Sequence, residues 1–311
     1  MSGFFELKTI TNRLNLHPLA QRFLQANQKL YSRGKSNRSI TQLIQPPQPV
    51  ILARDHSAEI ETDLIDGIWS TLGTAVHEFF ETHAVGDDVV TEERLFTDEL
   101  GWTISGAIDA QFTDEQGRVA LIDYKVTSVW TVIYNSSGKS EWINQMHGYR
   151  WLYNRCKGVD VDKLSILAIL RDWKKRDAQT RGSDYPDSPI QLIDIPLWTL
   201  DDMNKYVKTR ITAHQEAEYA NLVGEPLPEC SDAERWLRSA KYAVKKPANK
   251  RAMRVLDSEE DAEDYIKGLG VKGKGLVVEK RESEPTRCMD YCEGSNWCVQ
   301  YQSELEGSDE L

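Results

Sequence analysis

Hydrophobic and polar residues alternate along two neighbouring segments, 104–112 and 119–126, and this alternation predicts two β-strands. Between them, residues 115–117 suit a three-residue hairpin loop in which Gly117 takes the left-handed conformation. This loop sets a register in which Asp109 lies directly opposite Asp123. Lys125 follows two positions after Asp123 and therefore points to the same side of its strand.

The face that carries these charges also carries the apolar residues Ala107, Val119 and Leu121. We therefore expect the face to be half-buried, where unpaired charges are costly. Two directly opposed carboxylates, about 5 Å apart at their Cβ atoms, repel each other unless a cation lies between them. An ordinary salt bridge on an exposed strand is the alternative. The apolar neighbours favour the layout of a divalent-metal hydrolase.

Helical periodicity is present on both sides of the hairpin, at residues 66–81 and 141–154. The inner stripe of the first helix is formed by Leu72, Val76 and either Phe79 or Phe80. His77 lies on this helix, and a lone helical histidine is more often a core or surface residue than a ligand. Gln145 and Tyr149 share one face of the second helix, a spacing that is also typical of a plain helix surface.

The chain divides into three expected parts, an N-terminal helical segment at 1–64, an α/β core at 65–221 and a cysteine-bounded module at 222–311. After the second helix, the core has strand patterns and then a helix that Thr199 begins as a cap; these lie at 164–170, 190–195 and 199–221. The last module contains a strand, a helix and a strand, at 251–256, 258–269 and 276–282.

Five cysteines form a second group of candidate ligands. Cys288, Cys292 and Cys298 lie in one short, turn-rich segment and need a fourth thiol to complete a tetrahedral or cubane site. We expect Cys230 to supply it and Cys156 to be a buried apolar residue. The odd count and the lack of a signal-peptide pattern exclude a secreted disulfide framework and favour a cytoplasmic protein.

The net charge of −11 argues against a general nucleic-acid coat, but the charge is unevenly distributed. One stretch without any acidic residue contains eight cations, Arg235, Arg238, Lys241, Lys245, Lys246, Lys250, Arg251 and Arg254. Trp236 and Tyr242 are interleaved with them and could stack on unpaired bases. A solvated helix face is the alternative. A second basic run, 171–181, is expected to be an exposed loop, and no apolar run is long enough to span a membrane.

Four short motifs in this order resemble the RecB-type branch of the PD-(D/E)XK nucleases, which includes RecB, AddB, CRISPR-associated and phage-encoded exonucleases. The motifs are Gly73-x3-His77, Gly106-x-Ile108-Asp109, Asp123-Tyr124-Lys125 and Gln145-x3-Tyr149. The resemblance implies a restriction-endonuclease-like core, with a mixed central sheet flanked by helices.

The resemblance also implies roles for individual residues. The side chains of His77, Asp109 and Asp123, with the Tyr124 carbonyl, would bind Mg²⁺ or Mn²⁺. Lys125 would position or activate water, and Gln145 and Tyr149 would line the nucleic-acid path.

Some nucleases of this branch carry a [4Fe-4S] cluster, and three of its cysteine ligands follow the nuclease core. Cys288, Cys292 and Cys298 resemble that arrangement. In those proteins the first cysteine precedes the motifs, whereas here Cys230 follows them. Structural Zn²⁺ and unligated thiols are the alternatives, although zinc knuckles usually have a tighter Cys-x2-Cys spacing.

The resulting interpretation is a metal-dependent DNA exonuclease that acts at DNA ends in recombination or repair. It would be encoded by a phage or prophage and would act beside an annealing protein or a helicase. A nucleic-acid-binding protein with a repurposed nuclease fold and a structure-selective endonuclease are the alternatives.

Overall fold

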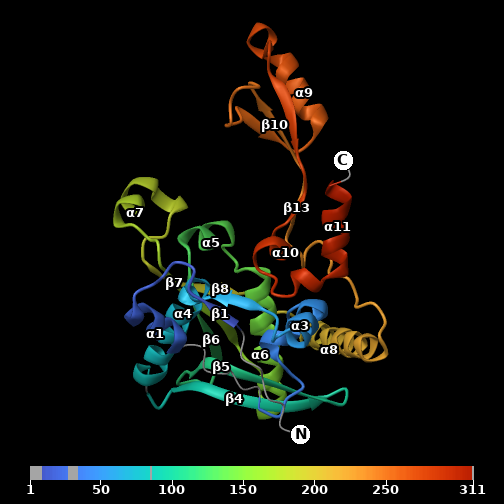
Figure 1. The fold of residues 1–311 in the computed structure, drawn as a ribbon. Helices are drawn as coiled ribbons and strands as arrows, with labels where there is room; N and C mark the ends of the chain where they lie inside the picture. Colours follow the sequence, from blue (N-terminus) through green and yellow to red (C-terminus); the bar gives the residue numbers. More distant parts are fainter. Residues whose placement is uncertain (1–8, 27–33, 85, 310–311) are drawn as a thin grey trace. The chain divides into compact units, whose positions relative to one another are not determined.

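The computed structural model describes residues 9–26, 34–84 and 86–309 (Figure 1). The chain forms two compact units rather than three consecutive parts. Unit 1 consists of Met1–Pro47 and His56–Glu225, and unit 2 consists of Gln48–Asp55 and Pro226–Leu311. The expected N-terminal segment is therefore shared between the two units, because residues 48–55 pack with the C-terminal part of the chain.

Unit 1 contains a six-stranded mixed sheet with strand order β2-β5-β6-β7-β8, and β4 pairs with β5. The bounds are β2 (Arg38–Ser39), β4 (Val89–Glu99), β5 (Trp102–Thr113), β6 (Val119–Thr127), β7 (Lys163–Leu170) and β8 (Ile190–Ile195). β5 is antiparallel to β4 and β6, β6 is parallel to β7, and β7 is antiparallel to β8. The expected mixed sheet with flanking helices is thus confirmed.

The β5–β6 hairpin has the predicted register. Gln111 pairs with Leu121, and the last pair of the ladder toward the sheet centre is Ala110 with Ile122. Gly117 ends the loop with φ 78°, a left-handed conformation that glycine adopts without steric cost. The carboxylate of Asp114 accepts the N–H groups of Gln116 and Arg118, which holds the loop closed.

The main helices of unit 1 begin and end near the predicted positions. They are α4 (Ile68–His83), α6 (Ser140–Lys157) and α8 (Leu200–Val223), joined by the shorter α1 (Pro18–Ala26), α2 (Ile40–Leu43), α5 (Val129–Tyr134) and α7 (Lys175–Arg181). Thr199 caps α8 as expected. α6 buries Trp142, Met146 and Trp151 in the core. On α4, Phe80 is the inner residue, because it stacks on Tyr124 whereas Phe79 is 63% exposed.

Two short strands complete unit 1, β1 (Thr9–Thr11) and β3 (Glu61–Asp63), which pair in parallel. The run 171–181 is only partly a loop, because α7 occupies its second half. No helix in the described ranges has the length and apolar character needed to cross a membrane.

Unit 2 has two small sheets. β10 (Lys241–Lys245) lies between β11 (Arg254–Leu256) and β12 (Val277–Arg281), with α9 (Glu259–Gly268) in the connection, while β9 (Leu237–Arg238) pairs with β13 (Glu284–Pro285). α3 (Pro47–Asp55), α10 (Thr286–Asp290) and α11 (Val299–Asp309) are its other helices. The predicted strand–helix–strand order is confirmed. β10 was not predicted, because its lysines obscure the apolar alternation.

Candidate active site

Three acidic residues lie side by side on the neighbouring strands β4, β5 and β6. The pairs Thr91–Ala110 and Glu93–Ile108 place Glu92 opposite Asp109, and the register of the hairpin places Asp109 opposite Asp123. The regular ladder is interrupted at this level on both sides of β5. Glu92 has φ 50°, a left-handed conformation that is uncommon for a residue other than glycine and is often found at functional sites.

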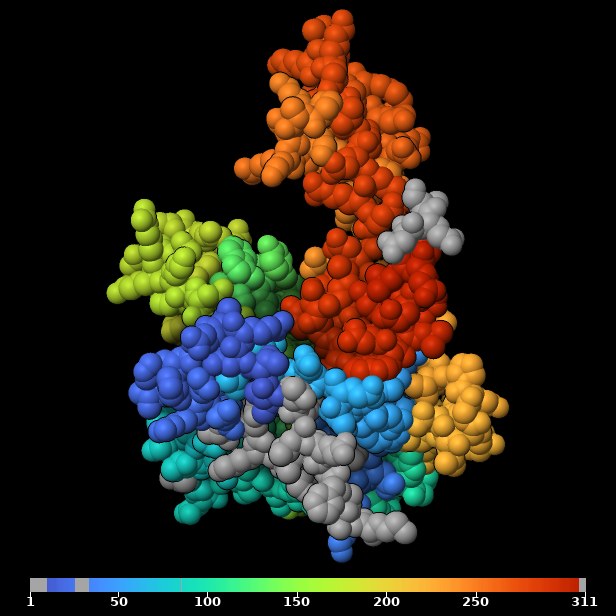
Figure 2. Space-filling model, viewed as in Figure 1, coloured from blue at the N-terminus to red at the C-terminus, as the bar shows by residue number. Residues whose placement is uncertain are grey.

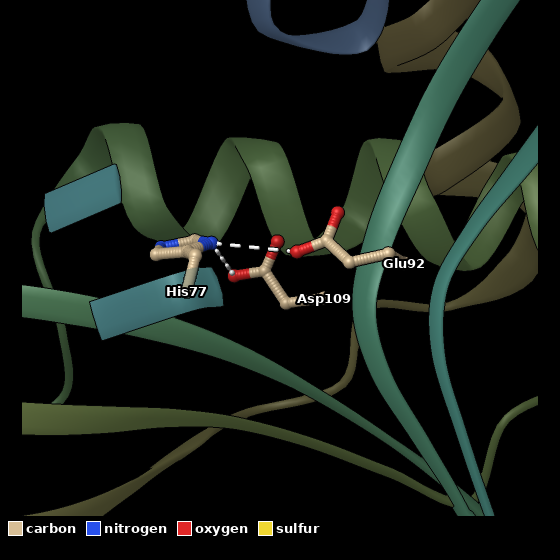
Figure 3. Close-up of side chains that lie close together, drawn as sticks. All are labelled: His77, Glu92 and Asp109. Carbon is tan, nitrogen blue, oxygen red and sulfur yellow. Dashed lines mark ion pairs between the residues drawn. The ribbon is translucent and has the colours of Figure 1, made fainter. Parts of the chain in front are cut away.

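His77 reaches this acidic level from α4 (Figure 3). Its Nδ1 lies 3.5 Å from Asp109 Oδ2 and 3.6 Å from Glu92 Oε1. Its Nε2 lies 3.1 Å from the Tyr124 carbonyl oxygen. Among the described residues, His77, Glu92 and Asp109 are the one group of three metal-ligating side chains whose ligand atoms all lie within 4.8 Å of one another. His77 and Asp109 therefore meet as predicted, whereas Asp123 is not part of this group.

Glu92 was missed by sequence reasoning, which considered the hairpin and not the strand that precedes it. The available signal was a pair of adjacent acidic residues, Glu92 and Glu93, between the apolar pairs Val89-Val90 and Leu95-Phe96. The two diverge in the structure, because Glu93 pairs with Lys157 and accepts from Gln111. Periodicity alone does not distinguish which of the two enters the site.

Asp109 is 6% exposed and accepts the Tyr124 N–H at 2.8 Å. Burial, together with the charge of Asp123, raises the pKa of Asp109 to about 7 against the opposing effects of His77, Tyr124 and Lys125. Burial alone would lower the pKa of His77, but a hydrogen bond with Glu92 and the charges of the carboxylates outweigh it and raise that pKa. The site therefore has an excess of negative charge that favours a bound cation.

Asp123 stands beside this group, and its charge acts on both His77 and Asp109. Its Oδ1 accepts a hydrogen bond from Gln145 Nε2 at 3.1 Å, and its Oδ2 lies 2.5 Å from Lys125 Nζ. No described residue gives Oδ2 an aligned hydrogen bond, although this oxygen is buried. A buried carboxylate oxygen with unused acceptor capacity fits a metal ligand.

Gln145 donates a hydrogen bond to Asp123, and Tyr149 lies beside Gln145. Gln145 is 9% exposed and Tyr149 is 4% exposed, and the amide of Gln145 also donates to Tyr149 Oη at 3.0 Å. Gly106 permits this packing, since a Cβ atom there would lie 3.0 Å from both Tyr149 Cε1 and Leu152 Cδ2. The predicted contact of Gln145 and Tyr149 with nucleic acid stays a prediction, and in this structure both side chains are buried.

The metal-ligand chemistry of the first unit is that of a hard divalent cation. The donors that lie together are the His77 imidazole nitrogen and the carboxylates of Glu92 and Asp109. Asp123 is not part of this group, and the Tyr124 carbonyl oxygen lies beside His77 Nε2. Oxygen-rich sites suit Mg²⁺ or Mn²⁺, and the imidazole shifts the preference toward Mn²⁺. The side chains of His77 and Glu92 are about a third exposed, so the site opens to solvent on their side.

In unit 2, the four cysteines proposed as ligands line one small cavity together with Gln48 and Arg235. The Gln48 side-chain oxygen accepts from the thiols of Cys298 at 3.4 Å and Cys230 at 3.6 Å. Burial, with the neighbouring charges of Glu234 and the other thiols, raises the pKa of Cys230 to about 12, and burial also raises the pKa of Cys292 and Cys298. Cys156 lies on α6 in unit 1, where its thiol donates to the Phe96 carbonyl.

The basic stretch 235–254 is partly neutralised by ion pairs. Arg235, which was predicted to bind DNA, is 6% exposed and pairs with Glu304. Three further cations also have acidic partners, as Arg238 does with Glu284, Lys241 with Asp257 and Lys245 with Glu279. Lys246, Lys250 and Arg251 lie exposed between β10 and β11, and Arg254 lies over the Tyr265 ring.

Trp236 and Tyr242, expected to stack on bases, have different surroundings. Trp236 is 38% exposed and packs edge-on against Tyr291, with the Arg287 guanidinium 5.3 Å from its ring centroid. Tyr242 is half-buried in the sheet, where it pairs with Leu256 and Lys280. The free part of the stretch is therefore the loop between β10 and β11.

No family model and no curated protein matches the chain. Among solved structures, it is similar to SSO0001, at 17% identity and a TM-score of 0.41 over 62% of this chain and 84% of that chain. It is also similar to the alkaline exonuclease LHK-Exo from Laribacter hongkongensis in complex with dAMP, at 15% identity and a TM-score of 0.34 over 70% of this chain and 90% of that chain.

A third similar structure is a putative exonuclease from Eubacterium rectale, at 14% identity and a TM-score of 0.27 over 73% of this chain and 82% of that chain. All three TM-scores are below 0.5, so none of these similarities identifies the function of the chain.

Proposed function

We propose that this protein is a metal-dependent nuclease that hydrolyses DNA phosphodiester bonds and acts as an exonuclease at DNA ends. One observation carries the proposal. His77 Nδ1, Glu92 and Asp109 gather within ligand distance of one ion, directly beside the Asp123–Lys125 pair. Such a combination of carboxylates, imidazole and ammonium at a half-open site is what phosphodiester hydrolysis requires.

The residues of the site divide into metal ligands, a cation that faces the phosphate and a residue that positions a ligand. Asp109, Asp123 and His77 would hold Mg²⁺ or Mn²⁺ together with the Tyr124 carbonyl, and Glu92 is a further candidate ligand. When bound, the ion supplies Lewis acidity and lowers the pKa of bound water. Lys125 is one-quarter exposed and lies next to the acids, where its ammonium stabilises negative charge on the phosphate. Gln145 holds Asp123 in position through Oδ1.

The exonuclease assignment and its biological setting rest on the motif resemblance described above. It favours trimming of DNA ends during recombination or repair, in a phage or prophage and beside an annealing protein or a helicase. The complete set of His77, Asp109, Asp123 and Lys125 argues against a repurposed binding protein, since loss of any one of them would remove the chemistry. A structure-selective endonuclease would use the same residues and is distinguished by its substrates.

We further propose that Cys230, Cys288, Cys292 and Cys298 hold a [4Fe-4S] cluster, with Zn²⁺ as the alternative. The four thiols line one cavity, and burial raises the pKa of Cys230 and Cys298, as expected for thiols that lose their protons when a metal binds. Cys288 and Cys292 are separated by three residues, whereas zinc knuckles usually have the tighter Cys-x2-Cys pair, and this spacing favours the iron–sulfur cluster over Zn²⁺.

Labelled linear DNA and circular single-stranded DNA, incubated with Mn²⁺, test the nuclease proposal. We expect the linear DNA to be degraded and the circle to remain intact. Lys125→Ala and Asp123→Ala should abolish the activity, whereas Lys163→Ala, an exposed lysine on the neighbouring strand, should retain it. Cleavage of the circle would indicate an endonuclease, and full activity of both active-site variants would refute the site. Iron, sulfide and zinc analysis of protein purified without oxygen decides between the cofactors.

A further inference from the structure

Three large aromatic side chains remain exposed near the carboxyl end of β6. Trp69 is 53% exposed, Trp130 is 39% exposed and Tyr134 is 76% exposed. The Arg171 guanidinium lies 3.9 Å from the Trp69 ring centroid, and the Arg181 guanidinium lies 5.1 Å from that of Trp130. Trp130 and Tyr134 stack at 6.0 Å with an interplanar angle of 24°. A group of exposed aromatic faces, interleaved with arginines, is typical of a binding surface rather than of a core.

The aromatic residues form two groups, Trp69 in one and Trp130 with Tyr134 in the other. The consecutive residues Arg171 and Asp172 hold these groups in place. The Arg171 N–H donates to the Thr127 carbonyl at 3.0 Å, which fixes Arg171 at the end of β6. The Asp172 carboxylate accepts the Val129 N–H at 2.7 Å and the Ser128 hydroxyl at 2.8 Å, which begins α5 and places Trp130 in its first turn. The two aromatic groups are therefore attached to one rigid corner of the sheet.

This corner adjoins the proposed active site in two ways. Thr127 follows Lys125 by two residues on β6. Trp69, Gly73 and His77 are spaced at i, i+4 and i+8 on α4, so they follow one side of that helix. A Cβ atom at Gly73 would meet nothing within 4 Å. The helix surface between the exposed tryptophan and the metal-site histidine is therefore open.

The charge of the surrounding segment is complementary to a polyanion. Residues 171–181 contain two acids and five cations, and the five cations are all exposed: Arg171, Lys174, Lys175, Arg176 and Arg181. One of the two acids, Asp172, is engaged with the start of α5. In a chain of net charge −11, this local excess of positive charge is suited to phosphates. The surfaces of α5 and α7 adjoin in the space-filling view, green and yellow-green in Figure 2.

We infer that Trp69, Trp130 and Tyr134, with Arg171 and Arg181, form a platform on which the unpaired bases of single-stranded DNA stack as the strand approaches the metal site. The inference rests on the proposed nuclease function and specifies its substrate. Stacking requires free base faces, which a duplex conceals, so the platform selects a single-stranded end. Because every base has a π-face, this recognition tolerates any sequence.

Binding of fluorescently labelled oligothymidylate to the full-length protein tests the platform, with EDTA present to prevent cleavage. An abasic oligomer of the same length keeps the phosphates and lacks the bases, and a blunt duplex conceals the bases. We expect Trp130→Ala/Tyr134→Ala to weaken oligothymidylate binding roughly 10- to 100-fold and to change abasic and duplex binding less than about twofold. Tyr219→Ala, at a tyrosine on α8 that is 64% exposed, should leave the binding of all three unchanged.

Equal losses for the oligothymidylate and the abasic oligomer would overturn the proposal, since only phosphates would then be contacted. Unchanged oligothymidylate binding would also overturn it and would point to a protein partner for this surface. If the double alanine variant does not fold, Trp130→Leu/Tyr134→Leu keeps side-chain volume and still removes the aromatic faces. Trp130→Phe/Tyr134→Phe keeps the aromatic rings and lacks the indole N–H and the tyrosine hydroxyl. It should therefore bind oligothymidylate again, a result that a structural role of those polar groups would not explain.

Mn²⁺ binding separates a failure of this inference from a failure of the proposed function. We expect the platform variants to bind Mn²⁺ like the parent protein, because none of their changes removes a ligand. Conversely, His77→Ala should lose Mn²⁺ and retain oligothymidylate binding in EDTA. A parent protein that binds no Mn²⁺ would refute the proposed function whatever the oligonucleotide result.

Discussion

Asp109 and Asp123 face each other one residue beyond Ala110 and Ile122, the last pair of the β5–β6 ladder. At this position the Tyr124 N–H donates to the Asp109 side chain, at 2.8 Å, in place of a backbone hydrogen bond between the strands. The strand pair thus separates at the position of the two carboxylates, and the Tyr124 N–H keeps a hydrogen-bond partner. The same hydrogen bond fixes Tyr124, whose carbonyl faces His77. The ligand set is therefore organised before any ion binds.

Asp109→Asn should stabilise the metal-free protein at neutral to alkaline pH. The pKa of Asp109 in the folded state is about 7, whereas an unfolded aspartate has a pKa of about 3.9. The folded state thus binds more protons between these values, and its free energy of unfolding falls as pH rises from about 4 to about 7. The amide avoids this loss, so we expect about 1–3 kcal/mol of added stability at about pH 8 and none at about pH 4. Urea unfolding in EDTA measures both; a variant less stable than the parent at the higher pH contradicts the prediction.

Mn²⁺ affinity should decrease as pH falls below about 7. A metal ion must displace the proton that the raised pKa keeps on Asp109, and also the proton on His77, whose pKa is raised as well. Each pH unit below about 7 should therefore lower the apparent affinity by at least about tenfold. Isothermal titration calorimetry at several pH values gives the profile. Asp194→Asn, which changes an acid outside the site, should leave the profile as it is. An affinity independent of pH between about 5.5 and 7 is the opposite outcome.

Glu92→Gln should lower the pKa of His77 in the metal-free protein, because the hydrogen bond and the charge of Glu92 both raise it. It should also weaken Mn²⁺ binding by about tenfold or more if Glu92 is a ligand. NMR titration of the His77 ring measures the pKa. Glu93→Gln is the matched control, since the adjacent Glu93 pairs with Lys157. A His77 pKa that both variants lower equally would mean that Glu92 has no specific contact.

Gln145→Leu should reduce kcat far more than it changes DNA affinity. The change removes the donor to Asp123 Oδ1 and leaves that buried oxygen unsatisfied, which costs about 1–3 kcal/mol. We expect a kcat about 10- to 100-fold lower, because a misplaced ligand impairs the chemistry and not the binding surface. Single-turnover kinetics and binding in EDTA separate the two effects. A loss confined to DNA affinity would restore the role in the nucleic-acid path.

Two glycines of the motifs should respond to alanine in opposite ways. Gly106→Ala places a methyl group 3.0 Å from Tyr149 and Leu152, and such overpacking costs about 1–3 kcal/mol. Gly73→Ala meets nothing within 4 Å on an α-helix and should stabilise the protein by up to about 1 kcal/mol. Thermal unfolding of the two variants compares them directly. Destabilisation by Gly73→Ala would reveal a packing constraint that the structure does not contain.

The sequence by itself determined the hairpin and the residues that it aligns. Strict alternation and Gly117 are local features, and a three-residue loop permits one register, so these features alone bring Asp109, Asp123 and Lys125 together. The helices around His77 and Gln145 followed from periodicity in the same way. The grouping of Cys230 with the three later cysteines followed from the need of a tetrahedral or cubane metal site for a fourth thiol.

Only the tertiary structure decided which neighbours complete these elements. Glu92 enters the site through a left-handed backbone conformation, Gln145 and Tyr149 are buried against Asp123, and Arg235 is paired with Glu304. Each outcome depends on segments far apart in the chain, and periodicity reports which face of an element is apolar without reporting what covers it. For the same reason, the sequence alone does not show that the exposed aromatic residues lie together at the end of β6. They do so because α4, α5 and the end of β7 meet there.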